Sequence, residues 1–179
     1  MSRLPQLTAE TADEQQRELL GETQRQLGRV PNLYAALANG PAALRGYLAL
    51  RDALAHGVLR LRVREQLALL VANDNHCAYC VAAHTFRGGK LGMSGEQLAA
   101  TRRAEDDDPH TAAILRVARE VRRTGGDVGD DLLAEVRAAG VTDAELAEVV
   151  AHVALNTLSN MFNHLARPEL DFPKVEVAA

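Results

Sequence analysis

Residues 65–84 read EQLALLVANDNHCAYCVAAH and contain the only two cysteines of the chain, Cys77 and Cys80. The apolar spacing of residues 61–73 predicts a helix, and the polar residues that follow predict a break. A second helix is expected from about Cys77 to about residue 87. On that helix, Cys77, Cys80 and His84 stand at i, i+3 and i+7, so their side chains share one face. The stretch therefore predicts two helices joined by a turn, with a thiol pair at the start of the second helix.

The rest of the 179-residue sequence predicts an all-α fold. Alanine and leucine dominate, aromatic residues make up 3%, and there is no tryptophan. Alanine and leucine are strong helix formers, whereas strands favour β-branched and aromatic residues. Two capping boxes, Ser94-x-x-Gln97 and Thr142-x-x-Glu145, mark helix starts, and Thr8 is expected to cap the first helix. We predict one domain, residues 1–179, of seven or eight helices with short connections and a non-helical tail. Apart from a short apolar segment at 31–38, the expected helices are 8–27, 41–56, 61–73, 77–87, 94–104, 109–124, 130–139 and 142–166.

The composition excludes several classes of protein. The formal net charge is −4 and charges of both signs are interspersed, so the sequence lacks the basic footprint of a nucleic-acid-binding protein. No apolar run approaches the roughly 18 residues of a membrane span, and the N-terminus lacks the apolar core of a signal peptide. We therefore expect a cytoplasmic protein with no membrane or nucleic-acid partner. Thiols stay reduced in the cytoplasm, which favours a catalytic or metal-binding cysteine pair over a structural disulfide.

The surroundings of the two cysteines predict reactive thiols. Cys77 is expected at a helix N-terminus, where free N–H groups and the helix dipole favour a thiolate. His84 lies one helical turn beyond Cys80 and can accept a thiol proton or stabilise a thiolate. Glu65, on the preceding helix, is placed to orient His84 or to stabilise its charge. These four residues form the candidate catalytic group.

Three other interpretations of the cysteine pair stay open from the residues alone. A structural disulfide would close a very small loop and would gain little stability from chain entropy. Two incidental buried cysteines would carry no chemistry. A structural zinc site needs four ligands, and the chain has no second cysteine pair. Its ligands would be Cys77, Cys80 and His84, completed by His76, His152 or His164.

The spacing of these residues resembles a known family. A glutamate, eleven residues, Cys-x-x-Cys, three residues and a histidine form the pattern of the AhpD-like alkylhydroperoxidases. These are the thiol-active branch of the carboxymuconolactone decarboxylase-like superfamily. Residues 65–84 match every interval, and residues 30–34 (VPNLY) and 156–164 (NTLSNMFNH) resemble the peroxidase-related subgroup. The resemblance implies an AhpD-like helical bundle that assembles as a homo-oligomer, either a trimer or a hexamer built from trimers.

The same resemblance implies a peroxidase-type thiol oxidoreductase. It would reduce hydroperoxides through a reversible Cys77–Cys80 disulfide, without an organic cofactor or a metal. Cys80 would attack the peroxide, Cys77 would resolve the sulfenic acid, and Glu65 and His84 would relay protons. The helix-terminus argument instead favours Cys77 as the more acidic thiol, so this division of roles stays open. The reductant would be a lipoyl group, a thioredoxin-like protein or a small thiol. The alternative is a metal-binding or redox-sensing module whose thiols do not turn over.

Further residues are expected near the thiols. Tyr79 stands where the best-known hydroperoxidase of the family has a histidine, and tyrosine does not titrate near neutral pH without a large shift. This departure predicts weaker peroxidase activity. His164, with Asn160 and Asn163, is a candidate to line the thiol site from the same or a neighbouring subunit, and the alternative is a packing role in the core. His76 is expected to cap the helix or to pack beside the thiols. The decarboxylase branch typically lacks the cysteine pair, so decarboxylation of a lactone is not expected.

Overall fold

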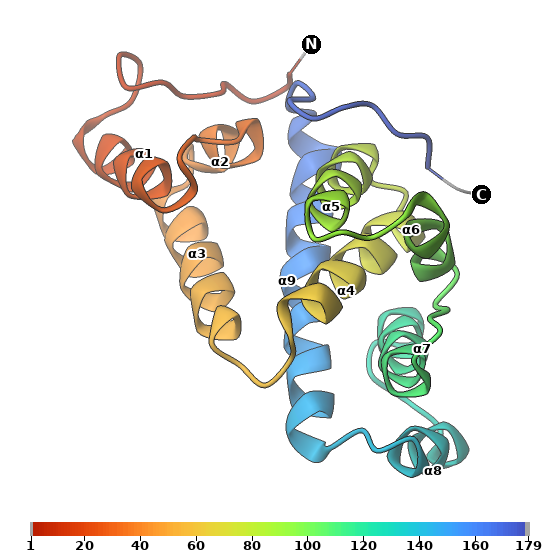
Figure 1. Cartoon of the computed structure of the whole chain (residues 1–179). Helices are drawn as coiled ribbons and strands as arrows, with labels where there is room; N and C mark the ends of the chain where they lie inside the picture. Colours follow the sequence, from red (N-terminus) through yellow and green to blue (C-terminus); the bar gives the residue numbers. More distant parts are fainter. Residues whose placement is uncertain (1, 178–179) are drawn as a thin grey trace.

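The computed structural model describes residues 2–177, and this part of the chain forms nine helices and no strand (Figure 1). The predicted all-α fold is confirmed. The short apolar segment after Pro31 is itself a helix, α2, of six residues. In chain order the helices are α1 (Glu14–Leu27), α2 (Asn32–Leu37), α3 (Pro41–Ala55), α4 (Leu61–Asp74), α5 (Ala78–Lys90), α6 (Gly95–Arg102), α7 (Pro109–Thr124), α8 (Asp130–Ala138) and α9 (Asp143–Ala166).

Helices α4 and α9 form the centre of the fold. α4 packs against α5, α6, α7 and α9, and α9 also packs against α3 and α7. Figure 1 shows α9 running the height of the molecule, with α1–α3 on one side of it and α5–α8 on the other. Every residue from Gln66 to Asn73 is buried. This explains why the sequence of α4 is apolar over a continuous run rather than along one stripe.

Two apolar clusters hold α4 from different sides. The first joins α4 to α1, α2, α3 and α5 and includes the fully buried Leu44 and Val81. The second joins α4 to α7 and α9 and includes the fully buried Ile114 and Val149. Fully burying an aliphatic side chain of this size is worth about 1.5–3 kcal/mol. The two clusters therefore fix the position of α4, and with it the turn that leads to the cysteines.

The start of the first helix differs from the prediction. Thr8 does not cap α1. Its backbone N–H donates to the Thr11 hydroxyl and closes a turn that precedes the helix. The cap is Asp13, whose side chain accepts from the Gln16 backbone N–H while the Gln16 side chain accepts from the Asp13 N–H. The capping boxes predicted at Ser94 and Thr142 are confirmed at the starts of α6 and α9.

The end of α5 also differs from the prediction. The sequence Gly88-Gly89 does not stop this helix, which continues to Lys90. A Cβ atom on Gly88 would lie 2.7 Å from Cδ2 of Leu98 on α6. A side chain at position 88 would displace Leu98, so the glycine suits the close approach of the two helices and does not mark a turn of the backbone.

The C-terminal segment after α9 is non-helical, as predicted, and folds over the start of α5. The rings of Phe172 and Tyr79 meet edge to face with their centroids 5.7 Å apart. Asp171 accepts hydrogen bonds from the Tyr79 hydroxyl at 2.6 Å and from the backbone N–H of Asn32 at 3.2 Å. Arg29 adds an ion pair to Asp171 at 3.4 Å. The tail therefore ties α5 to the start of α2.

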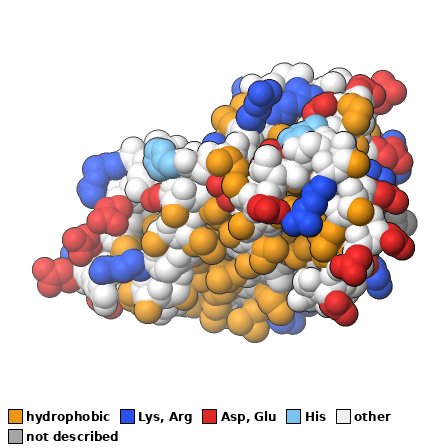
Figure 2. All heavy atoms as spheres, turned by 90° about the horizontal axis from the view of Figure 1, so that it is seen from below, with side chains coloured by type: hydrophobic (Ala, Val, Ile, Leu, Met, Phe, Trp, Pro, Cys, Tyr) orange, Lys and Arg blue, Asp and Glu red, His pale blue; other side chains and the backbone are white. Residues whose placement is uncertain are grey.

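Helix α9 has an unusual distribution of side chains. Its buried face carries the polar residues His152, Asn156, Ser159, Asn160 and Asn163, and its exposed face carries the apolar residues Val150, Ala154, Leu158, Met161 and Leu165. Figure 2 views the molecule from below and shows hydrophobic side chains gathered over the middle of that side.

No helix within residues 2–177 combines the length and the apolar character needed to cross a membrane.

Candidate active site

The turn between α4 and α5 sets the position of both cysteines. His76 adopts a left-handed conformation with φ of 52°, and the Cys77 N–H then donates to the Ala72 carbonyl at 2.9 Å. Cys77 is the N-cap of α5, and Cys80 lies in its first turn. Both side chains are free thiols and both are buried. The predicted placement of Cys77 at a helix N-terminus is therefore confirmed.

The two thiols interact with each other and differ in acidity. A hydrogen bond from Cys80 lowers the pKa of Cys77 to about 7, although burial opposes this, and the charge of His164 and a hydrogen bond from Asn163 lower it further. The same contact with Cys77, together with burial, raises the pKa of Cys80 well above its ordinary value. With this pKa, a large share of the molecules has lost one thiol proton at neutral pH, and in these the remaining proton is shared by the pair and the negative charge lies mainly on Cys77.

Helix α9 supplies polar groups to the thiols. The amide nitrogen Nδ2 of Asn163 donates to the sulfur of Cys80 at 3.0 Å, and Asn160 favours the charged form of the same cysteine. Asn160 also accepts from Nδ2 of Asn75 at 2.9 Å, which fixes the turn before α5. These donors stabilise a thiolate on Cys80 once the proton leaves it. Asn160 and Asn163 thus lie at the thiol site, which is one of the two locations that the sequence left open for them.

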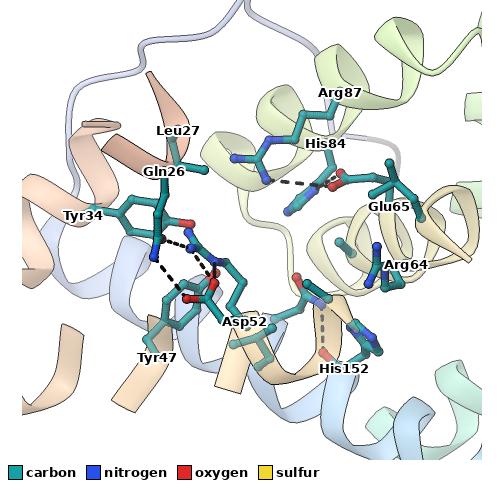
Figure 3. Close-up of a pocket in the computed structure, with 16 residues that line it drawn as sticks. Gln26, Leu27, Tyr34, Tyr47, Asp52, Arg64, Glu65, His84, Arg87 and His152 are labelled. Atoms are coloured by element: carbon teal, nitrogen blue, oxygen red, sulfur yellow. Dashed lines mark hydrogen bonds and ion pairs between the residues drawn. The ribbon is translucent and has the colours of Figure 1, made fainter. Parts of the chain in front are cut away.

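Glu65 and His84 form a hydrogen-bonded pair between α4 and α5. Nδ1 of His84 lies 2.7 Å from Oε2 of Glu65, and Arg87 approaches the other carboxylate oxygen at 4.0 Å (Figure 3). Burial raises the pKa of Glu65, but the charge and hydrogen bond of His84, helped by Arg87 and Arg64, outweigh burial and leave this pKa below its ordinary value. Glu65 is therefore a carboxylate that fixes the imidazole and leaves Nε2 as the working nitrogen.

Two cavities meet at His84. A small void of about 20 Å³ is lined by Cys80, His84, Tyr79 and Ser159 among others. A larger cavity of about 370 Å³ adjoins the Glu65–His84 pair. His84 lines both, but among the described residues no hydrogen bond joins it to either sulfur. A molecule in the small void would contact Cys80 on one side and His84 on the other.

The remaining predicted residues fall in three different places. His76 is exposed and lies outside the thiol site. His164 is also exposed, and its Nε2 lies 2.8 Å from the Asn75 carbonyl, so it acts on Cys77 through charge alone. Tyr79 lines the small void, and its hydroxyl is held by Asp171 and by the Leu33 N–H. Burial, first, and the hydrogen bond to Asp171 raise the pKa of Tyr79, so it does not replace the family histidine as a proton carrier.

The structure also bears on the zinc interpretation. Within residues 2–177, no three or more His, Cys, Asp and Glu side chains are arranged to hold a metal ion. His76 and His164 point to solvent, and His152 lines the larger cavity instead of the thiols. The ligand set that the sequence allowed is not assembled in the described part of the chain.

The sequence pattern of the Carboxymuconolactone decarboxylase family matches residues 41–123, which include the thiol motif. No match was found among curated proteins. Among solved structures, the chain is similar to an uncharacterised peroxidase-related protein with an alkylhydroperoxidase AhpD core from Ralstonia eutropha JMP134. The two share 27% identity over 95% of this chain and 92% of the other, with a TM-score of 0.82.

Two further solved structures share the fold. A peroxidase-related protein from Silicibacter sp. TM1040 has a TM-score of 0.78 at 20% identity, over 93% of this chain and 92% of the other. A cysteine-to-alanine variant of the debrominase Bmp8, in complex with 2,3,4-tribromopyrrole, has a TM-score of 0.76 at 13% identity, over 96% and 92%. At these identities the likeness concerns the fold alone.

Proposed function

Because the chain belongs to the AhpD-like, carboxymuconolactone decarboxylase-like superfamily, we propose that it is a thiol peroxidase that reduces hydroperoxides through a reversible Cys77–Cys80 disulfide. One observation carries the proposal. Two free, buried thiols share a hydrogen bond that makes one of them acidic, and the other lines a void beside the Glu65–His84 pair. An acidic thiol next to a second cysteine is the arrangement that peroxide reduction needs.

The first step transfers one oxygen atom to sulfur. The proton that Cys80 shares with Cys77 moves to Cys77, which leaves a thiolate on Cys80 with Asn163 donating to it. The Cys80 sulfur attacks the terminal oxygen of R–O–OH, the O–O bond breaks, and Cys80 becomes a sulfenic acid. The leaving alkoxide takes the proton that Nε2 carries in the imidazolium form of His84, whose Nδ1 stays bonded to Glu65, and departs as an alcohol.

The second step closes the disulfide. Cys77, now carrying the shared proton, attacks the sulfur of the sulfenic acid, and the S–O bond breaks. The departing hydroxide combines with that proton to form water. Together, one thiol, one thiolate, the His84 imidazolium proton and a hydroperoxide become a disulfide, an alcohol and water, and solvent then returns a proton to His84. A thiol reductant, either a small thiol, a lipoyl group or a thioredoxin-like protein of the cytoplasm, then returns both cysteines to thiols.

Single cysteine variants test the assignment of roles. With Cys77→Ser, one equivalent of peroxide should convert Cys80 to a sulfenic acid that a sulfenic-acid trap labels. With Cys80→Ser, peroxide should leave Cys77 unlabelled. The reverse pattern would assign the attack to Cys77. Steady consumption of peroxide by the parent protein with dihydrolipoamide would show turnover, whereas a single oxidation without turnover would support the redox-sensing alternative.

A further inference from the structure

The cavity of about 370 Å³ beside the Glu65–His84 pair has a mainly apolar wall with charged groups at separate points (Figure 3). It lies between α3 on one side and α4, α5 and α9 on the other. Its volume is in the range of small-molecule sites. The apolar part of the lining consists of Leu27, Tyr34, Tyr47, Ala55, Leu61, Ala68 and Leu155.

The charged residues of this cavity do not balance. Three arginines face two carboxylates, which leaves one positive charge when the histidines are counted as neutral. Arg51 is paired with Asp52 at 2.6 Å, and Arg87 lies 4.0 Å from Glu65. Arg64 forms no ion pair with any residue from 2 to 177. Within this part of the chain its guanidinium makes one hydrogen bond, from Nη1 to the Leu54 carbonyl at 2.8 Å, which uses one of five N–H donors.

A second polar group in the wall lacks a partner. His152 is 95% buried, and its Nε2 atom has no hydrogen bond within the described part of the chain. Burial, and then the nearby charge of Arg64, lower the pKa of His152, so its imidazole is neutral at pH 7. Figure 3 shows Arg64 and His152 as neighbours at the same end of the cavity. A buried nitrogen without a partner costs free energy unless a ligand satisfies it.

The geometry points to an organic hydroperoxide that carries a carboxylate, with the carboxylate held by Arg64 and His152 and the carbon chain along the apolar wall. This inference rests on the proposed peroxidase function. The void of about 20 Å³ at Cys80 has room for one water-sized group, which suits the terminal oxygen of the hydroperoxide. The two cavities share the lining residues Tyr34, Tyr47, His84 and Arg87 and therefore adjoin, and the inferred substrate extends across this shared wall from the carboxylate site toward the thiol.

Binding to the reduced protein tests the carboxylate site without any redox step. We would compare 6-hydroxyhexanoate, the reduced form of 6-hydroperoxyhexanoate, with its methyl ester by isothermal titration calorimetry at pH 7. The two have the same carbon chain, but only the acid is charged. The acid should bind at least about 10-fold more tightly, because a hydrogen bond to a charged group is worth roughly a 10- to 100-fold change in affinity. Equal affinities in the unmodified protein would overturn the inference.

Variants of α4 locate the effect. Arg64→Gln should remove the preference for the acid, and Arg64→Lys should restore part of it, because lysine keeps the charge but not the paired donors. Arg62→Gln is the matched control, since Arg62 lies two residues away on α4 and does not line the cavity. Loss of the preference in Arg62→Gln as well would contradict the assignment to Arg64.

Oxidation by 6-hydroperoxyhexanoate, its methyl ester and hydrogen peroxide separates this inference from the proposed function. The acid should oxidise the thiols faster than the ester, and Arg64→Gln should bring the two rates together. If all three peroxides oxidise the thiols and the acid has no advantage, the function stands and the carboxylate site fails. If the acid binds selectively but no peroxide oxidises the thiols, the carboxylate site stands and the peroxidase function fails.

Discussion

At the scale of single residues, the shared proton of Cys77 and Cys80 governs reactivity. Contact with Cys80 lowers the pKa of Cys77 to about 7. A thiol with an ordinary pKa near 8.5 is only a few per cent thiolate at pH 7. The pair therefore presents far more thiolate than an isolated cysteine, although both sulfurs are buried. Removing one cysteine should change the acidity of the other.

We predict that titration of the reduced protein, followed by the ultraviolet absorbance of thiolate, shows one thiolate per chain with a midpoint near pH 7. The second thiolate should form only at a much higher pH, because burial and the first charge oppose it. In Cys80→Ala the midpoint of Cys77 should rise, since the hydrogen bond from Cys80 is lost. An unchanged midpoint in this variant would show that the helix N-terminus alone sets the acidity of Cys77.

His84 should matter for the rate and little for thiol acidity. It lines the void at Cys80 but bonds to Glu65, not to sulfur. His84→Gln should slow the loss of thiols to peroxide at pH 7 by a factor on the order of 10²–10⁴, as removal of a general acid usually does. Glu65→Gln should have a milder effect of the same kind. Stopped-flow measurements would check both.

The control for this prediction is His76→Gln, because His76 is exposed and lies outside the thiol site. It should react like the parent. If His84→Gln also reacted with peroxide at the parent rate, His84 would not be the proton donor, and the pairing with Glu65 would be structural.

The four candidate catalytic residues could be identified from spacing because they lie within twenty residues of one another. Cys77, Cys80 and His84 are on one helix, and Glu65 is on the adjacent helix in the sequence. Spacing could not predict the hydrogen-bond partners of Tyr79 and Cys80. Asp171 and Asn163 lie 92 and 83 residues from them in the sequence, and only the packing of α9 and the tail brings them together.

At the scale of elements, the C-terminal tail is held by a side chain of α5. Tyr79 donates to Asp171 and accepts from the Leu33 N–H, so it connects three segments. Tyr79→Phe keeps the ring packed on Phe172 but leaves Asp171 and the Leu33 N–H without this partner. We predict a loss of about 1–3 kcal/mol in the free energy of unfolding, measured in urea.

Glu176→Gln provides the comparison for Tyr79→Phe. Glu176 is in the same tail, but its carboxylate forms only an exposed ion pair with Lys174 at 3.3 Å. Exposed ion pairs contribute little, so the free energy of unfolding should stay within about 0.5 kcal/mol of the parent. A Tyr79→Phe protein as stable as Glu176→Gln would mean that the tail is not anchored by this hydroxyl.

Helix boundaries were predictable where a local side chain decides them. Ser94 and Thr142 cap their helices through residues three positions later, and that pattern is visible in the sequence. Thr8 offered a plausible cap, but Asp13 makes the stronger, reciprocal one. Gly88 shows the limit of local reasoning. It lies inside α5 and leaves room for the side chain of Leu98 on the next helix, so it does not mark a helix end.

At the scale of the whole molecule, α9 presents apolar side chains to the outside. Val150, Ala154, Leu158, Met161 and Leu165 lie within about 80° of one another around the helix axis, by the 100° turn per residue. Met161 is 68% exposed and Leu165 61%. A continuous apolar stripe over four turns is more than isolated surface residues explain. We propose that the homo-oligomer implied by the family resemblance, a trimer or hexamer, covers this stripe.

We predict that light scattering of the reduced protein detects an oligomer and that the double variant Met161→Glu, Leu165→Glu shifts it toward monomer. Both side chains are exposed within one chain, so the fold should persist, as circular dichroism would verify. Leu91→Glu, an exposed apolar residue at the end of α5, should leave the assembly intact. A monomeric parent protein would contradict the proposed assembly.

The all-α class followed from composition and helical spacing, and the bundle followed from the family resemblance. The larger cavity did not follow from either, because α1, α3, α4, α5 and α9 each contribute part of its wall. Spacing indicates which residues share a helix face, but it does not indicate which faces of distant helices meet. Arg64 and His152 are 88 positions apart in the sequence, and nothing local relates them.

The most direct test of the central claim counts thiols. Reduced protein would be treated with one equivalent of hydroperoxide per chain, and the remaining thiols and the intact mass would be measured. The account predicts that two thiols are lost for each peroxide consumed and that a disulfide links Cys77 to Cys80 within one chain, reversible by a dithiol. Retention of both thiols, or a disulfide only between chains, would contradict it.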